Sequence, residues 1–236
     1  MALQYVGAEL REDRELVLQA VRSNGAALVY ADMPLQGDKD LVLEAVRQDG
    51  MAFQFASRQL REDPDVIVAA LRQNGLALSL VQRRLRDNRV YATEAVKQNG
   101  LALEFVAPEW RRDRDVVRIA VRSNVQALQM AHPDIRQEPE FVLDAVKTKG
   151  VALQYALGSL RSDRDFVLKA LDKNVWAFGS AARELRADRD FVLEGMKKNN
   201  MALEFATPDV REDPGFLAQA QQNDGSKLLD PGFLAQ

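Results

Sequence analysis

The sequence predicts an all-α fold: a curved α-solenoid of nine 25-residue helix-turn-helix repeats. Cutting the chain every 25 residues from Met1 aligns nine segments without an insertion. Such a fixed period is typical of solenoids, in which each unit packs on its neighbours. The second position of all nine segments is alanine and the third is Leu or Phe, which indicates a closely packed core. Positions within a repeat are numbered below as slots 1 to 25.

The repeats predict one solenoid domain over residues 1–225, followed by a partial or degenerate repeat over 226–236. This tail copies the heptapeptide of residues 213–219 at 230–236 and breaks the period. Solenoids need polar terminal caps, and uncapped ends would allow self-association. The expected repeats are 1–25, 26–50, 51–75, 76–100, 101–125, 126–150, 151–175, 176–200 and 201–225.

A long helix is expected to start after slot 13, which is Asp in seven of nine segments. Asp is a favoured N-cap, and Pro64, Pro139 and Pro214 stand at the first helical position, where proline costs no hydrogen bond. Apolar residues at slots 16, 17, 20 and 21, such as Phe166 and Ala170, form one face. Asp-x-Asp pairs such as Asp113 and Asp115 are therefore interpreted as capping residues rather than as metal ligands.

The long helix is expected to end near an Asn-Gly pair. Glycine at slot 25, in Gly25, Gly50, Gly75, Gly100, Gly150 and Gly225, predicts a left-handed C-terminal residue. Val125 and Val175 cannot adopt that conformation cheaply, so these two joints are expected to differ locally.

The rest of each repeat predicts a shorter helix over about slots 1 to 6, for example residues 101–106. Pro108, Pro133 and Pro208 at slot 8 disfavour helix at the residue before them, and the Thr207-Pro208-Asp209 sequence predicts a further one-turn helical piece. Alanine at slot 2, in Ala2, Ala27, Ala52, Ala77, Ala102, Ala127, Ala152, Ala177 and Ala202, and the apolar residues of slots 3 and 10 are expected in the core.

Composition weighs against several function classes. The 236 residues contain no cysteine and one histidine, so thiolate sites and clusters of several histidines around a metal cannot form, and His132 is the one histidine that a Ser-His-Asp triad could use. His132 is interpreted as a turn residue. Neither a phosphate-binding loop nor a dinucleotide fingerprint is present. We therefore expect no enzyme activity, no cofactor and no catalytic or metal-binding residue. No apolar run reaches the roughly 20 residues that span a bilayer, so a cytoplasmic protein with no membrane partner is expected.

The repeated motif ALQYA followed by L-R-x-D-R-x-x-V-L-x-A-V-x-x-N-G resembles an uncharacterised tandem helical repeat family, a domain of unknown function found in bacterial and protist proteins. The resemblance covers residues 1–225 and implies repeat architecture without a known reaction. If the chain resembles the secreted effectors among these proteins, the host cytosol is its expected location. Residues 112–124 are also similar, more weakly, to leucine-rich variant repeats.

Arginine occupies slot 11 in eight repeats: Arg11, Arg61, Arg86, Arg111, Arg136, Arg161, Arg186 and Arg211, with Gln36 as the exception. We expect these guanidinium groups to cap the carbonyl end of the short helix or to pair with an Asp; tracking a phosphate backbone is the alternative. Slot 5 is mostly aromatic, in Tyr5, Tyr30, Phe55, Phe105, Tyr155 and Phe205. Core packing is the favoured interpretation there, and base stacking the alternative.

Charge is concentrated in the middle of the chain. Repeat four has a net charge of +3 and repeat five of +1, whereas repeats two and nine carry −3 and −4. We predict a binding patch for an acidic partner at Arg83, Arg84, Arg86, Arg89, Arg111, Arg112 and Arg118. The expected function is a non-enzymatic scaffold that binds another protein on its concave face, with slots 4, 7, 8, 12 and 19 setting specificity. Single-stranded nucleic-acid binding is the alternative, although the net charge of −3 weighs against it.

Overall fold

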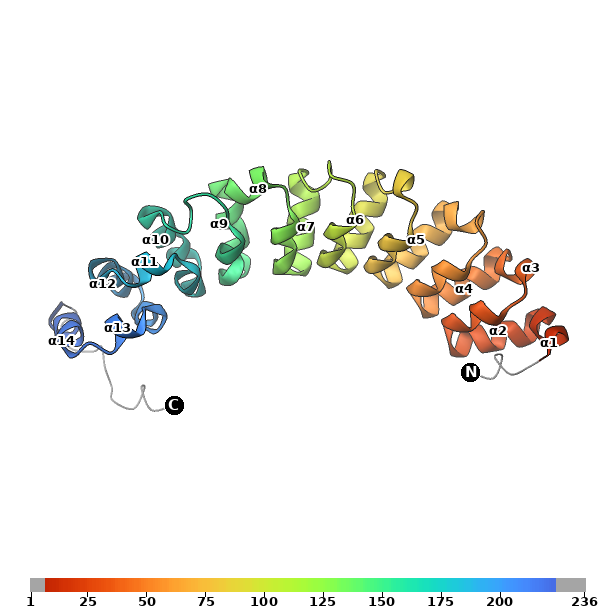
Figure 1. The fold of residues 1–236 in the computed structure, drawn as a ribbon, viewed down its shortest axis with the longest axis horizontal. Coiled ribbons are helices and arrows are strands. Elements are labelled where there is room, and N and C mark those ends of the chain that lie inside the picture. Colours follow the sequence, from red (N-terminus) through yellow and green to blue (C-terminus); the bar gives the residue numbers. More distant parts are fainter. Residues whose placement is uncertain (1–6, 224–236) are drawn as a thin grey trace. The chain divides into compact units, whose positions relative to one another are not determined.

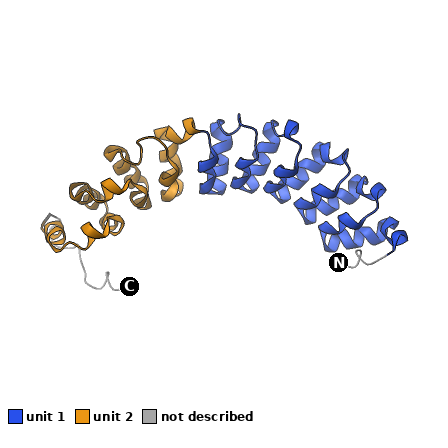
Figure 2. Ribbon diagram, in the orientation of Figure 1, with its two compact units in different colours: residues 1–132 blue, residues 133–236 orange. Residues whose placement is uncertain are grey.

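The computed structural model describes residues 7–223. The predicted tail at 226–236, Gly225, Ala2 and Tyr5 lie outside these residues. The chain divides into two compact units, Met1–His132 and Pro133–Gln236, which are coloured separately in Figure 2. Each unit is a row of helical repeats, and the described part contains no strand, so the expected all-α repeat architecture is confirmed. The domain boundaries expected from the repeats stay a prediction.

Each repeat contributes a long α-helix over slots 14 to 23, as Figure 1 shows for the labelled series. The N-cap prediction is confirmed, because the side chain of Asp63 accepts hydrogen bonds from the backbone of Asp65 and Val66. Asn88 caps its helix in the same way. The long helices are α2 (Arg14–Ser23), α4 (Lys39–Gln48), α5 (Pro64–Gln73), α6 (Arg89–Gln98), α7 (Arg114–Ser123), α9 (Pro139–Thr148), α10 (Arg164–Lys173), α12 (Arg189–Lys198) and α14 (Pro214–Asn223).

The expected shorter helix is present, but it is a 3₁₀ helix that starts one residue earlier, at slot 25. The residue at slot 24 explains where this 3₁₀ helix starts. Asn74 ends α5 and its side chain accepts a hydrogen bond from the backbone of Leu76, so one residue caps the next helix as it leaves the first. The 3₁₀ helices are η2 (Gly25–Tyr30), η3 (Gly50–Phe55), η5 (Gly75–Leu80), η7 (Gly100–Glu104), η8 (Val125–Met130), η9 (Gly150–Tyr155), η10 (Val175–Ser180) and η11 (Asn200–Phe205).

A third, shorter piece completes the repeat. The one-turn helix expected at Pro208 is present, and a similar one begins at Pro133, whereas the chain after Pro108 forms only hydrogen-bonded turns. Residues 158–162 also form turns. The short pieces are α1 (Ala8–Glu12), α3 (Met33–Gln36), η4 (Leu60–Glu62), η6 (Arg83–Leu85), α8 (Pro133–Gln137), α11 (Arg183–Arg186) and α13 (Pro208–Arg211).

The prediction of left-handed glycines at slot 25 is wrong. In the described chain only Gly158 has a glycine φ in the positive region, at 67°. Glycine is needed at Gly75 because the next repeat is too close: a Cβ on Gly75 would lie 2.2 Å from the carbonyl oxygen of Ala95. A 3₁₀ helix also begins at Val125 and at Val175, so the local difference expected at these two joints does not change where this helix starts.

Two layers of helices stack within each unit. In the first unit α2, α4, α5, α6 and α7 contact one another in order, and their 3₁₀ helices do the same. In the second unit α9, α10 and α12 form one layer and η9, η10 and η11 the other. The described alanines of slot 2 and the apolar residues of slot 3 are all buried, as expected.

Slots 5 and 10 only partly follow the core prediction. At slot 10, Leu60 and Ile135 are buried, but Leu10 is 45% exposed. The aromatic residues of slot 5 in the described chain, such as Phe105, are half-buried. Slot 5 therefore lies at the edge of the core.

Candidate binding site

Several slot 11 arginines bind main-chain carbonyls, some in their own repeat and some in the next one. Arg86 donates to the carbonyls of Ser79 and Val81 in its own repeat, at 2.7 and 2.8 Å. Arg161 donates from Nε to the carbonyl of Ser180 in the following repeat, at 2.8 Å. The carbonyl of Arg161 in turn accepts from the amide of Ala182, at 2.7 Å. Capping of the 3₁₀ helix is therefore confirmed for these residues.

Gln36, the exception in sequence, performs the same task. Its Nε2 donates to the carbonyls of Ala31 and Leu28, at 3.1 and 3.3 Å. Burial lowers the pKa of Arg86, with the neighbouring Arg83 as the second cause, and burial also lowers the pKa of Arg136. These groups are thus built into the scaffold, which leaves fewer of their donors for a ligand.

A second series of cations, at slot 14, was not singled out from the sequence. Five of these six side chains reach the N-cap aspartate of the next repeat, so one carboxylate caps its own helix and also binds the preceding repeat. The sequence contained a signal for these pairs: a cation stands directly after the N-cap residue, and a carboxylate stands 24 residues after that cation. The pairs are Arg14–Asp38 at 2.7 Å, Lys39–Asp63 at 2.9 Å, Arg89–Asp113 at 3.3 Å, Arg164–Asp188 at 2.9 Å, and Arg189–Asp213.

The seven arginines of the predicted patch differ in their contacts, and their joint role in binding stays a prediction. Arg89 lies at the start of α6 and pairs with Asp113 and Asp115, and Arg118 on α7 also pairs with Asp115, at 2.8 Å. Nη2 of Arg112 lies 2.8 Å from Nε2 of His132. These three arginines are therefore engaged within the protein.

The other four predicted residues, Arg83, Arg84, Arg86 and Arg111, line one depression between repeats four and five, with a volume of about 530 Å³. We call it the arginine depression. Its remaining walls come from the end of η7 and the turn that follows, and they are mostly apolar. They are formed by Glu104, Phe105, Val106, Ala107 and Pro108. The wall contributed by repeat five was not identified from the sequence, because the period alone does not say which slots of neighbouring repeats face each other.

Charge inside the arginine depression is strongly unbalanced. Its lining includes four guanidinium groups and one carboxyl group, that of Glu104. Arg84 is partly neutralised by Glu62 at 2.5 Å, and this contact lowers the pKa of Glu62. Arg111 donates to the main-chain carbonyl of Glu104. The exposed side chain of Arg83 makes no hydrogen bond or ion pair with any described residue, so it is the group most open to an anion.

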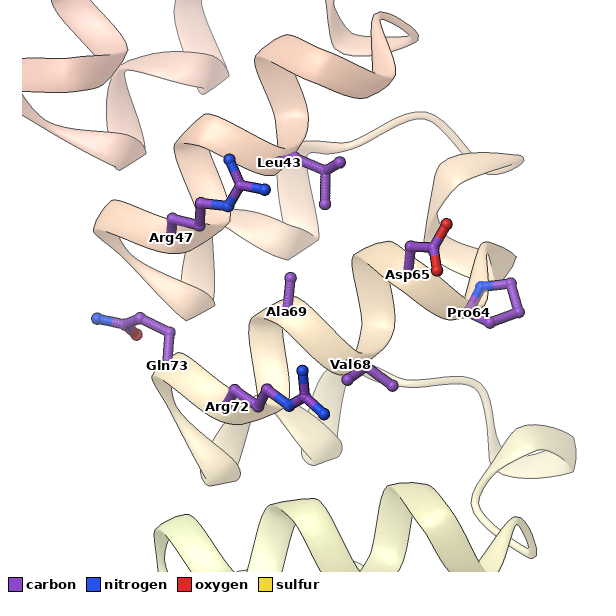
Figure 3. Close-up of a pocket in the computed structure, with 8 residues that line it drawn as sticks. All are labelled: Leu43, Arg47, Pro64, Asp65, Val68, Ala69, Arg72 and Gln73. Carbon is purple, nitrogen blue, oxygen red and sulfur yellow. The ribbon is translucent and has the colours of Figure 1, made fainter.

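Another depression, of about 830 Å³, lies between α4 and α5 (Figure 3). Leu43, Val68 and Ala69 supply its apolar lining, and Arg47 and Arg72 stand at its rim. Arg72 is paired with Glu94 at 2.8 Å and Arg47 lies 3.9 Å from Glu44. Because both cations have acidic neighbours, this groove is less suited to an anion than the arginine depression.

Residues 7–223 contain neither a helix that could span a membrane nor a cluster of metal-binding side chains. None of their helices combines the length and the apolar character needed to cross a membrane. No group of three or more His, Asp or Glu side chains in that part of the chain is arranged to hold a metal ion. The Asp-x-Asp pairs instead act at helix starts, as Asp113 does by accepting from the backbone of Asp115 and Val116.

Comparison with known proteins returns one family. A model described as a domain of unknown function (DUF4116) matches residues 1–36, 38–86, 91–136, 139–186 and 171–211, which is well over half of the chain. No curated protein and no solved structure matches.

Proposed function

Since the chain belongs to the family described as a domain of unknown function (DUF4116), a family that recurs along it, we propose that it is a non-enzymatic scaffold that binds an acidic segment of a partner protein in the arginine depression. The observation that carries this proposal is the depression itself, whose lining has four arginines and one carboxyl group and where Arg83 makes no hydrogen bond or ion pair with a residue of 7–223. A guanidinium group binds carboxylates through paired hydrogen bonds, so an exposed one beside others favours an acidic ligand.

The apolar wall supports a peptide ligand. Phe105 is half-buried and lies in the wall beside Val106 and Pro108, so an apolar side chain next to an acidic one would find a contact there. Three of the five wall residues from repeat five occupy slots 4, 7 and 8, which are among the variable slots expected to set specificity. An acidic peptide with one apolar residue therefore matches the lining better than a free anion does.

The test is fluorescence anisotropy with two labelled probes, an acidic peptide of alternating Glu and Leu residues and an oligothymidylate of similar length. We expect the peptide to bind and Arg83→Glu to weaken it about tenfold or more, because one charge is reversed beside three of the same sign. Arg58→Glu is the matched control, since Arg58 occupies the same slot one repeat earlier and lies outside the depression.

Equal binding of the peptide by wild type and Arg83→Glu, or no binding at all, would contradict the proposal. Tighter binding of oligothymidylate, with an affinity that falls steeply as salt is raised, would instead support nucleic-acid binding.

A further inference from the structure

A row of exposed apolar side chains runs along the second unit. Val151, Trp176 and Met201 occupy slot 1 in three consecutive repeats, and their exposed fractions are 40%, 55% and 39%. Each is the second residue of its 3₁₀ helix, and η10 contacts both η9 and η11, so the three helices are neighbours. We call these three residues the apolar ridge.

The ridge is confined to this unit, which is orange in Figure 2. In the first unit the same slot holds Ala26, the part-buried Met51, Leu76 and Leu101, and the polar Gln126. The repeat itself therefore does not require an exposed apolar side chain at slot 1. A contiguous exposed apolar row on a soluble surface is unusual and marks sites of interaction.

Lysine accompanies every residue of the ridge. Lys149, Lys173 and Lys198 precede the three ridge residues by two or three positions, at slot 23 or 24. No repeat of the first unit has a cation at either slot. Lys149 and Lys173 are exposed and have no ion pair or hydrogen bond through the side chain within the described chain, while Lys198 pairs with Asp172 at 3.0 Å.

The centre of the ridge is held in place. The ring of Trp176 meets the ring of Phe205 edge to face, with centroids 5.5 Å apart and an interplanar angle of 65°. A tryptophan that is ordered before binding loses little freedom when a partner covers it, and tryptophan is common among residues that dominate binding energy. Glu204 is the one acidic residue within η9, η10 and η11, and Asp172, which precedes Lys173 in the chain, is already paired with Lys198.

From this arrangement we propose that the apolar ridge, with its lysine edge, binds an amphipathic α-helix of a partner protein whose polar flank is acidic. Packed helices lie about 8–10 Å apart, and seven residues of an α-helix rise about 10.5 Å. A partner helix lying across the three repeats would therefore present one apolar contact per repeat from positions seven residues apart. Its acidic flank would face the unpaired lysines, and the projecting ridge would enter the groove between its side chains.

A library of displayed helical peptides, randomised on all exposed positions, tests the proposal with the full chain as bait. We expect selection to enrich peptides with apolar residues at seven-residue spacing and acidic residues beside them. An enriched peptide, labelled and measured by fluorescence anisotropy, is expected to bind Trp176→Ala at least tenfold more weakly than wild type. The double variant Lys149→Glu/Lys173→Glu is expected to lose binding as well, without touching the Phe205 contact.

Met33→Ala is the matched control, because Met33 is 82% exposed but lies outside the ridge. Arg83→Glu separates this site from the arginine depression, and it should leave binding of the enriched peptide unchanged. Unfolding midpoints verify that Trp176→Ala still folds. Enrichment of basic peptides, or of none, would overturn the proposal, and so would equal affinity for wild type and the double lysine variant.

Discussion

At the residue scale, close contact between repeats restricts single atoms. The slot 20 alanines of repeats two to five present their carbonyl oxygens to slot 25 of the preceding repeat. The amide of Gly75 also donates to the side chain of Gln98 at 2.6 Å. This approach excludes a Cβ at Gly75. Gly195 shows the same limit within a single repeat, because a Cβ on this residue of α12 would lie 2.7 Å from the ring of Phe178 in η10. A glycine next to a phenylalanine keeps the space between these two helices filled but not overfilled.

We expect Gly75→Ala to destabilise the protein by about 1–3 kcal/mol, because the added methyl group would lie 2.2 Å from the carbonyl oxygen of Ala95 and would force the repeats apart. Gly7→Ala is the control, since no atom lies within 4 Å of a Cβ there. Urea unfolding measures both. A loss for Gly75→Ala no larger than that for Gly7→Ala would show that the repeats separate at no cost.

At the element scale, the N-terminus of each long helix is also a junction between repeats. Asp188 accepts from the backbone of Phe191 and also pairs with Arg164 from the preceding repeat. Asp163 makes the corresponding cap to Phe166, but the preceding slot 14 is Pro139, which has no charge. The two aspartates are a natural matched pair, equal as caps and different in the ion pair.

We expect Asp163→Ala to cost about 1 kcal/mol from the lost cap. Asp188→Ala should cost the same plus a few tenths up to about 1 kcal/mol, because its ion pair with Arg164 is largely solvent-exposed. Unfolding in low and high salt tests this, since salt screens the pair and leaves the cap. If the two losses are equal in low salt, the inter-repeat ion pair contributes nothing.

At the scale of the whole molecule, the junction carboxylates couple stability to pH. The hydrogen bond from Arg14 holds the pKa of Asp38 below its ordinary value of 3.8. Backbone hydrogen bonds, chiefly from Phe216, lower the pKa of Asp213. Burial opposes the shift at Asp63 and Asp113, but hydrogen bonds there outweigh it, and the pKa of each is also lowered. The folded chain therefore takes up protons at lower pH than the unfolded chain.

Stability should consequently be fully present above the ordinary pKa of aspartate, 3.8, and should be lost as the pH falls below it towards the lowered folded values. Urea midpoints from neutral pH to about pH 2 measure this. In Arg14→Gln the urea midpoint should fall slightly less steeply on acidification, because Asp38 would lose the partner that lowers its pKa most. A midpoint that rises on acidification would contradict the assignment.

The sequence by itself determined the repeat, the long helix with its aspartate cap and proline start, and the buried alanine and leucine slots. These features depend on spacing within one repeat, and this spacing can be recognised because nine segments of the same chain share it. It also placed four arginines of the candidate site in adjoining repeats.

Only the tertiary structure decided how slots of neighbouring repeats face each other. The relative position of neighbouring repeats explains why Gly75 lies close to Ala95 and does not form a left-handed turn. It also places Arg89 and Arg118 on helices where they pair with acidic residues, and it brings Phe105 and Arg83 into the lining of one depression. The physical reason is that local hydrogen bonds and periodicity act within a repeat, whereas contacts between repeats depend on the distance and register at which two helices pack.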